Sequence, residues 1–188
     1  MGPRGRSGLP VLLRSAAMEA LMLEQVHAIL RDYATQEQRY QGIIYMMYAL
    51  RGGQPVPLYI GKSEKYGKKG HNLSANLKGI KATTQHPFAR WGYNYAYHLG
   101  DLSRVVLGHD DTHPPRYARW AQALFQQPVA ERRLKRDVFF WVKAWGAQDI
   151  GPWSAYGATN LAFLEYQLIG LASKAFPNDL LNEEGVGR

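Results

Sequence analysis

The sequence predicts an α+β protein in which a small three-stranded antiparallel sheet is flanked by helices. Residues 42–63 form an apolar and aromatic pattern typical of a β-hairpin, and residues 137–145 a β-branched and aromatic run typical of a third strand. Helical periodicity precedes the hairpin and follows the third strand. At 188 residues and 46% hydrophobic composition, the chain is long enough to bury a core.

We expect residues 1–16 to form a flexible basic arm and residues 17–188 to form one domain. This domain begins with an amphipathic helix over residues 17–34, because its apolar side chains recur at helical spacing. Insertions are expected around residues 64–85 and 99–135.

The hairpin is the most informative part of the chain. Its first strand is expected over Ile43 to Leu50, and its second over Val56 to Ile60, ending at Gly61. Gly52 and Gly53 between them supply the positive φ angles that a tight reversal needs.

Side chains alternate between the two faces of a strand, so Tyr45 and Tyr59 are expected to share one face of the sheet. Lys62 and Ser63 follow the second strand directly.

Three further helices are expected. The first opens at His86-Pro87, where proline suits a first turn, and the second runs from about Pro115 to Gln126. The last runs from about Thr159 to Ala175, and Glu165 falls inside its apolar stripe. A carboxylate on a buried face is costly unless it is paired or binds a cation, although a boundary residue reaching solvent would explain it too.

Charge favours a polyanionic partner. The net charge is +8, from 23 basic and 15 acidic residues. The candidate phosphate contacts lie in the glycine-rich loop after the hairpin and in a second basic patch: Lys65, Lys68, Lys69, His71, Arg132 and Arg133. A solvated basic loop and a solvated face are the alternatives.

Two further features of the composition indicate the cellular environment of the protein. No cysteine is present, which excludes disulfides and thiolate metal sites and favours a reducing cytoplasm. No apolar run approaches the roughly 18 residues of a membrane span, so no membrane partner is expected.

Residues Gly42-Ile43-Ile44-Tyr45 and Tyr59-Ile60-Gly61-Lys62 resemble the signature of the GIY-YIG nucleases. The second half matches letter for letter, and the first has one additional residue between Gly42 and Tyr45. The order of elements also resembles that family over roughly residues 42–182, so the resemblance implies the GIY-YIG nuclease fold.

The resemblance implies a metal-dependent phosphodiester hydrolase. Glu165 would bind one Mg²⁺ (or Mn²⁺), and Arg90 would hold the scissile phosphate, with Lys69 as the alternative. Tyr45 or Tyr59 would orient or deprotonate the attacking water, helped by Lys62 or another cation.

Two further residues complete the candidate catalytic set. His98 shares a helix face with Arg90, although a structural role is its alternative. Leu180-Leu181-Asn182 resembles the closing segment of the family, whose asparagine lies beside the active site.

The expected function is a DNA endonuclease, of restriction type because large insertions rather than a separate DNA-recognition domain are visible. A homodimer acting on a palindrome is one possible assembly. The rival hypotheses are a catalytically silent nucleic-acid-binding module of the same fold and a purely structural protein.

Overall fold

The computed structural model describes Leu12, residues 15–68, Gly70, residues 72–74, Leu77, residues 102–108 and residues 115–186. The chain divides into two compact units. The first comprises Met1–Glu19 with Lys78–Asp137, and the second comprises Ala20–Leu77 with Val138–Arg188.

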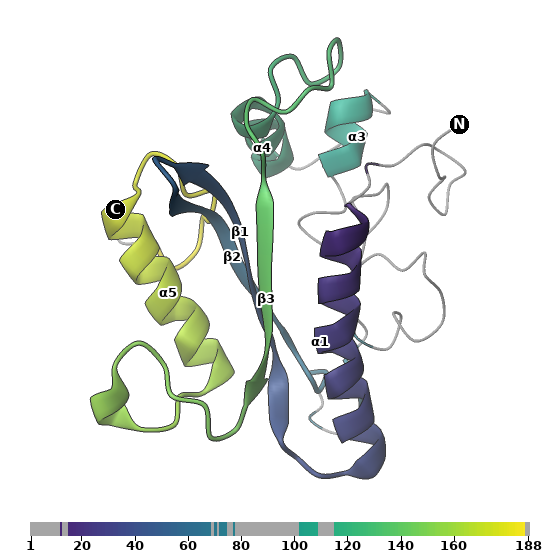
Figure 1. The fold of residues 1–188 in the computed structure, drawn as a ribbon, viewed down its shortest axis with the longest axis vertical. Helices are drawn as coiled ribbons and strands as arrows, with labels where there is room; N and C mark the ends of the chain where they lie inside the picture. Colours follow the sequence, from purple (N-terminus) through teal and green to yellow (C-terminus); the bar gives the residue numbers. More distant parts are fainter. Residues whose placement is uncertain are drawn as a thin grey trace. The chain divides into compact units, whose positions relative to one another are not determined.

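The second unit contains a three-stranded antiparallel sheet in the order β2–β1–β3 (Figure 1). Strand β1 spans Tyr40–Arg51, β2 spans Gln54–Glu64 and β3 spans Phe139–Gly146. Helices flank this sheet, so the predicted α+β class is confirmed. The turn between β1 and β2 has φ angles of 58° at Gly52 and 78° at Gly53, as its glycines predict.

Strand β2 is longer than the sequence predicts. It was expected to end at Gly61, but Gly61 pairs with Tyr45, Lys62 with Ile44 and Ser63 with Ile43. Strand β1 extends far enough to pair with each of these residues, so the hydrogen-bond ladder between the two strands continues to Glu64. Lys62 therefore lies within the strand rather than after it.

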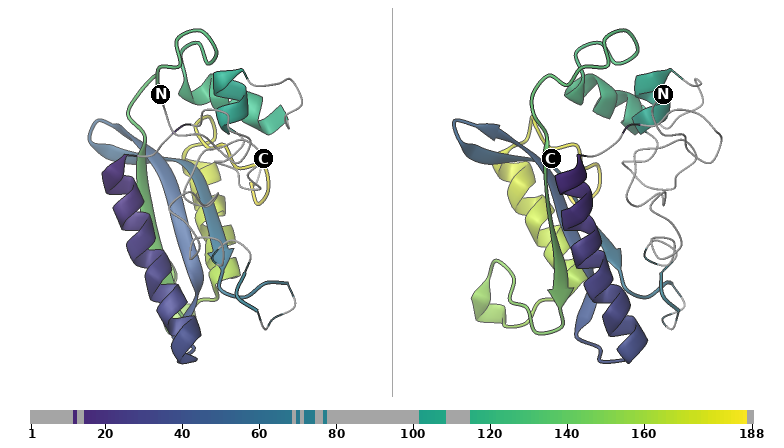
Figure 2. Two further views of the ribbon diagram at one scale, coloured as in Figure 1. Left: turned by 90° about the vertical axis from the view of Figure 1, so that its right-hand side faces the viewer. Right: turned by 45° about the vertical axis from the view of Figure 1, so that its right-hand side comes forward.

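Helices α1 and α5 lie on opposite sides of the sheet in both views (Figure 2). Helix α1 spans Ala16–Thr35, and α5 spans Leu161–Ala175, as the periodicity predicts. The core on the α5 side is made of buried residues from the sheet, the helix and the segment after it: Ile44, Ile60, Trp145, Leu161, Leu164, Ile169, Ala172 and Leu180.

The segment after α5 covers the outer edge of β2. The N–H of Leu181 donates to the carbonyl oxygen of Leu58 at 2.7 Å. The Asn182 side chain accepts from the N–H of Ile60 at 3.0 Å and donates to its carbonyl oxygen at 2.8 Å. A strand edge with unpaired backbone groups is prone to pair with other chains, so these three bonds complete and protect β2.

A buried ion pair ties α1 to the end of β2. The Lys65 ammonium lies 2.6 Å from the Asp32 carboxylate, and their side chains are 0% and 2% exposed. Asp32 also accepts from the N–H groups of Arg39 and Tyr40. Burial alone would raise the pKa of Asp32, but the bonds from Lys65 and the two N–H groups outweigh it and lower that pKa.

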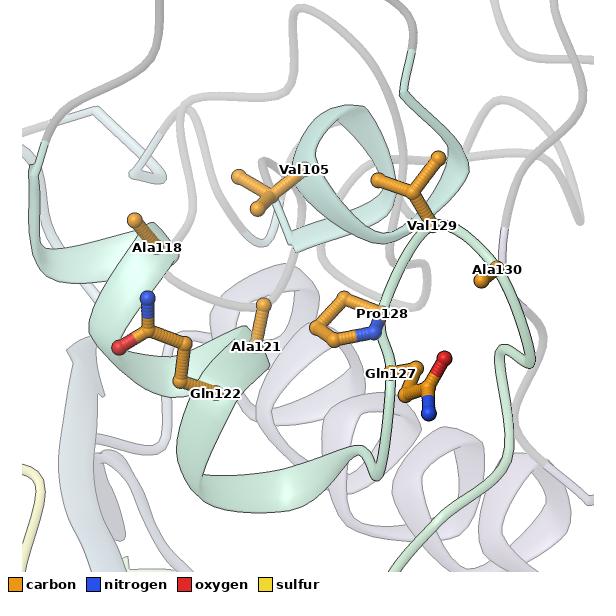
Figure 3. A pocket seen from close by; sticks show the side chains of 8 residues that line it. All are labelled: Val105, Ala118, Ala121, Gln122, Gln127, Pro128, Val129 and Ala130. Carbon is orange, nitrogen blue, oxygen red and sulfur yellow. The ribbon is translucent and has the colours of Figure 1, made fainter.

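The first unit contains α3, Leu102–Leu107, and α4, Pro115–Leu124. A hollow of about 390 Å³ lies beside them, with Val105, Ala121 and Val129 among its lining residues (Figure 3). None of its described lining residues can ionise at neutral pH, so we place the candidate chemistry in the second unit. No helix among the described residues is long and apolar enough to cross a membrane.

We expect Lys65→Met to lower the free energy of unfolding by about 3–5 kcal/mol, because it leaves the Asp32 carboxylate buried without its cation. Urea unfolding at pH 7 measures the change. Lys68→Met is the matched control, because Lys68 is exposed in the same loop and its loss is expected to cost about 0.5 kcal/mol or less. Equal effects of the two substitutions would contradict a stabilising pair.

Candidate functional site

Glu165 lies on α5 with its side chain 19% exposed. Its carboxylate accepts a hydrogen bond from the backbone N–H of Lys62. Because β2 is an outer strand of the described sheet, this N–H points away from β1 and would otherwise need a partner outside the sheet. Glu165 therefore sits at the outer edge of β2.

Tyr45 and Tyr59 share one sheet face, as their spacing predicts. Tyr59 pairs with Met47, which is two residues from Tyr45 on the same face of β1. The two ring centroids are 6.2 Å apart, and the Tyr45 ring also stacks on Phe140 at 5.7 Å. Because these three rings come from β1, β2 and β3, their contacts fix one another's positions on this face of the sheet.

Gly61 is where the two tyrosines meet. A Cβ atom on Gly61 would lie 2.7 Å from the Tyr45 hydroxyl oxygen and 2.9 Å from Cε1 of Tyr59. Both distances are too short for any side chain, so the tyrosines need glycine at this position. The Tyr45 hydroxyl thus lies across Gly61, and the Glu165 carboxylate binds the next residue, Lys62.

Lys62 contacts carboxylates. Its ammonium is 2.7 Å from Glu64 and 3.9 Å from Glu165. Lys62 is paired with Ile44, whose side chain belongs to the α5-side core, so its side chain leaves the sheet on the face opposite the tyrosines. This geometry therefore does not favour the expected role of Lys62, which was to help a tyrosine orient or deprotonate the attacking water.

Burial raises the pKa of Glu165 above its ordinary value. The charge of Lys62 and the Lys62 N–H lower it, while the negative charges of Glu64 and Glu184 raise it further. The net result is a carboxylate that is more costly to ionise than one in water. A bound cation would relieve that cost.

A single carboxylate can serve Mg²⁺, which keeps several of its waters and binds through one or two protein carboxylates. Glu165 fits this requirement, since it is partly exposed and lies near two further carboxylates. Among the described residues, no group of three or more His, Cys, Asp or Glu side chains is placed to hold a metal ion together, so Glu165 is considered as a single carboxylate ligand.

Asn182 is 6% exposed, and its side chain is bonded to both backbone groups of Ile60. Ile60 is two residues from Lys62 on the same strand edge. Asn182 therefore lies beside the candidate site, where its amide holds the strand that carries Gly61 and Lys62.

The predicted nucleic-acid contacts divide into three groups. Lys65 is buried against Asp32 and has no access to a phosphate, so its predicted nucleic-acid contact is wrong. Lys68 is exposed in the second unit, and Arg132 and Arg133 are exposed in the first. The remaining predicted residues lie outside the described residues: Lys69, His71, Arg90 and His98.

Sequence reasoning missed Asp32 and Gln41. Asp32 follows Met22, Val26 and Ile29 at helical spacing, so a carboxylate in the apolar stripe was a readable signal, as it was for Glu165. Gln41 accepts a hydrogen bond from the N–H of Leu161 at 2.7 Å. No pattern in the sequence pointed to that contact.

No protein-family model, no curated protein and no solved structure matches this chain.

The raised pKa of Glu165 predicts a pH effect on stability without divalent metal. The folded protein holds this proton more tightly than the unfolded chain, so stability falls as pH rises from the ordinary glutamate pKa through the raised value. Glu165→Gln should remove this loss and leave the free energy of unfolding at pH 7 equal to or above that of the wild type.

Urea unfolding between pH 4 and pH 8 in EDTA measures both proteins. A Gln variant clearly less stable than the wild type at pH 7 would mean that the carboxylate stabilises the fold.

We expect Asn182→Ala to lower the free energy of unfolding by about 2 kcal/mol, because it leaves two buried backbone groups of Ile60 without partners. Asn182→Asp keeps the acceptor but buries a carboxylate opposite the Ile60 carbonyl oxygen, so it should lower stability at least as much as Ala. Thermal unfolding at pH 7 compares the three, and an unchanged Ala variant would argue against this role.

Proposed function

We propose that this protein is a divalent-metal-dependent endonuclease that hydrolyses DNA phosphodiester bonds, of restriction type and related to the GIY-YIG nucleases. One observation carries the proposal. Two tyrosines from the signature hairpin lie over Gly61 on one face of the sheet, and a carboxylate that is costly to ionise reaches the next residue of this outer strand, Lys62, from the α5 side.

In the proposed mechanism, the two tyrosines act on the nucleophile and the phosphate. One tyrosine, ionised to the phenolate, would orient the attacking water and accept its proton to become a neutral phenol, and the hydroxyl of the other would donate to a phosphate oxygen. An unperturbed phenol has a pKa near 10, so it requires a neighbouring positive charge to act as a base at neutral pH.

Glu165 would hold Mg²⁺ (or Mn²⁺) through its partly exposed carboxylate. When bound, such an ion neutralises negative charge that develops on the phosphate and the leaving oxygen. Arg90 or Lys69 would complete the phosphate contacts, and His98 is the remaining candidate catalytic residue.

Charge and composition support DNA as the partner. A net charge of +8 favours a polyanion, and exposed Lys68, Arg132 and Arg133 are available for phosphates. A homodimer and a cytoplasmic location remain parts of the proposal.

The alternative, a silent nucleic-acid-binding module, is favoured by one observation. Tyr45 and Tyr59 are only 5% and 7% exposed, which suits packing as well as catalysis. A nuclease would then need an opening at Gly61 when DNA binds.

The test of function is cleavage of supercoiled plasmid in Mg²⁺, Mn²⁺ or EDTA. We expect metal-dependent cleavage by the wild type, and a loss of about 100-fold or more in Glu165→Ala, Tyr45→Phe and Tyr59→Phe. Tyr166→Phe is the matched control, because Tyr166 is exposed on α5 one residue from Glu165.

Full activity in Glu165→Ala would falsify the site. If the folded wild type binds DNA in a gel mobility-shift assay in a salt-dependent way but does not cleave it, the silent nucleic-acid-binding module is supported instead.

A further inference from the structure

We propose that Gln41 is a positioning residue whose side chain fixes the start of α5 on β1 and thereby sets Glu165 at the edge of β2. The inference rests on the proposed function, because it assigns a role within the same site.

A β-bulge directs Gln41 toward α5. The pairing of β1 with β3 shifts between Tyr40 and Gly42, so Gln41 is an extra residue in β1. Bulges re-aim side chains, often next to active sites. The Gln41 Oε1 atom accepts from the N–H of Leu161, the first residue of α5, at 2.7 Å.

The backbone of this bulge is fixed as well. The carbonyl oxygen of Gln41 accepts from the N–H of Lys65 at 2.7 Å, and Lys65 is held by the buried pair with Asp32. At the next residue, a Cβ atom on Gly42 would lie 2.7 Å from Cδ2 of Leu161. A Cβ atom there would also overlap the backbone carbonyl oxygen of Ser63, so only glycine fits where β1 passes close to Leu161.

Glu165 lies one helical turn beyond Leu161, so both residues are on the same side of α5. Leu161 is bonded to β1 through Gln41, and Glu165 is bonded to β2 through the Lys62 N–H. A helical turn is stiff, so a shift of the first turn moves the carboxylate away from Lys62 and Gly61.

The helix has a second cap that does not contact the sheet. The Asn160 side chain accepts from the N–H of Ala162 at 2.8 Å. Asn160→Ala therefore removes one capping bond from α5 but leaves it tied to β1. Gln41→Met also removes one capping bond, but that bond is the one that links α5 to β1. The two variants separate positioning from helix stability.

The experiment uses the full chain with Gln41→Met, Gln41→Glu or Asn160→Ala. Two quantities are measured: the Mg²⁺ concentration that gives half-maximal plasmid cleavage, and Mn²⁺ affinity from the EPR signal of free Mn²⁺. We expect Gln41→Met to weaken both by about 10-fold, the usual scale for losing a group that orients a metal ligand. Gln41→Glu keeps an acceptor oxygen and should stay within about twofold of wild type, as should Asn160→Ala.

Equal metal dependence in Gln41→Met and Asn160→Ala, or no rescue by Gln41→Glu, would overturn the inference while leaving the proposed function standing. A wild type that neither cleaves DNA nor binds Mn²⁺ would overturn both. If Gln41→Met does not fold, Gln41→Asn replaces it under the same criteria, because its side chain is one methylene too short to reach Leu161.

Discussion

The outer edge of β2 must find hydrogen-bond partners outside the sheet, and much of the second unit is arranged around that constraint. Leu58 and Ile60 find partners in Leu181 and Asn182, and Lys62 finds one in Glu165. Two segments that are distant in the sequence are thereby drawn to one strand. The same contacts that complete β2 also bring a carboxylate to Lys62, the residue next to the Gly61 position that the tyrosine pair covers from the other face.

This arrangement has a cost. Ionising Glu165 is unfavourable because burial and nearby negative charges oppose it, and the bond from Lys62 offsets only part of that penalty. Functional sites commonly retain groups that weaken the fold when no ligand is bound. The buried pair of Asp32 and Lys65 acts differently, since it holds α1 to the end of β2 and fixes the Lys65 backbone that bonds to Gln41.

Local patterns in the sequence predicted the hairpin, its glycine turn, the third strand, and helices α1, α4 and α5, because each depends on periodicity or turn chemistry. They also placed Tyr45, Tyr59 and Glu165 in the right elements. The end of β2 was wrong because pairing with β1, rather than local preference, decides where the strand stops. Lys65 was misjudged for a similar reason: its partner lies 33 residues away, and a loop lysine normally faces solvent.

The account makes Tyr45 and Glu165 parts of one site, and a double-mutant cycle tests this directly. Single-turnover cleavage rates are compared for wild type, Tyr45→Phe, Glu165→Ala and the double variant. If both groups act on the same reacting phosphate, the double variant loses little more activity than the worse single variant. Losses that multiply would show that the two residues act independently, and the convergence at Gly61 and Lys62 would then not be an active site.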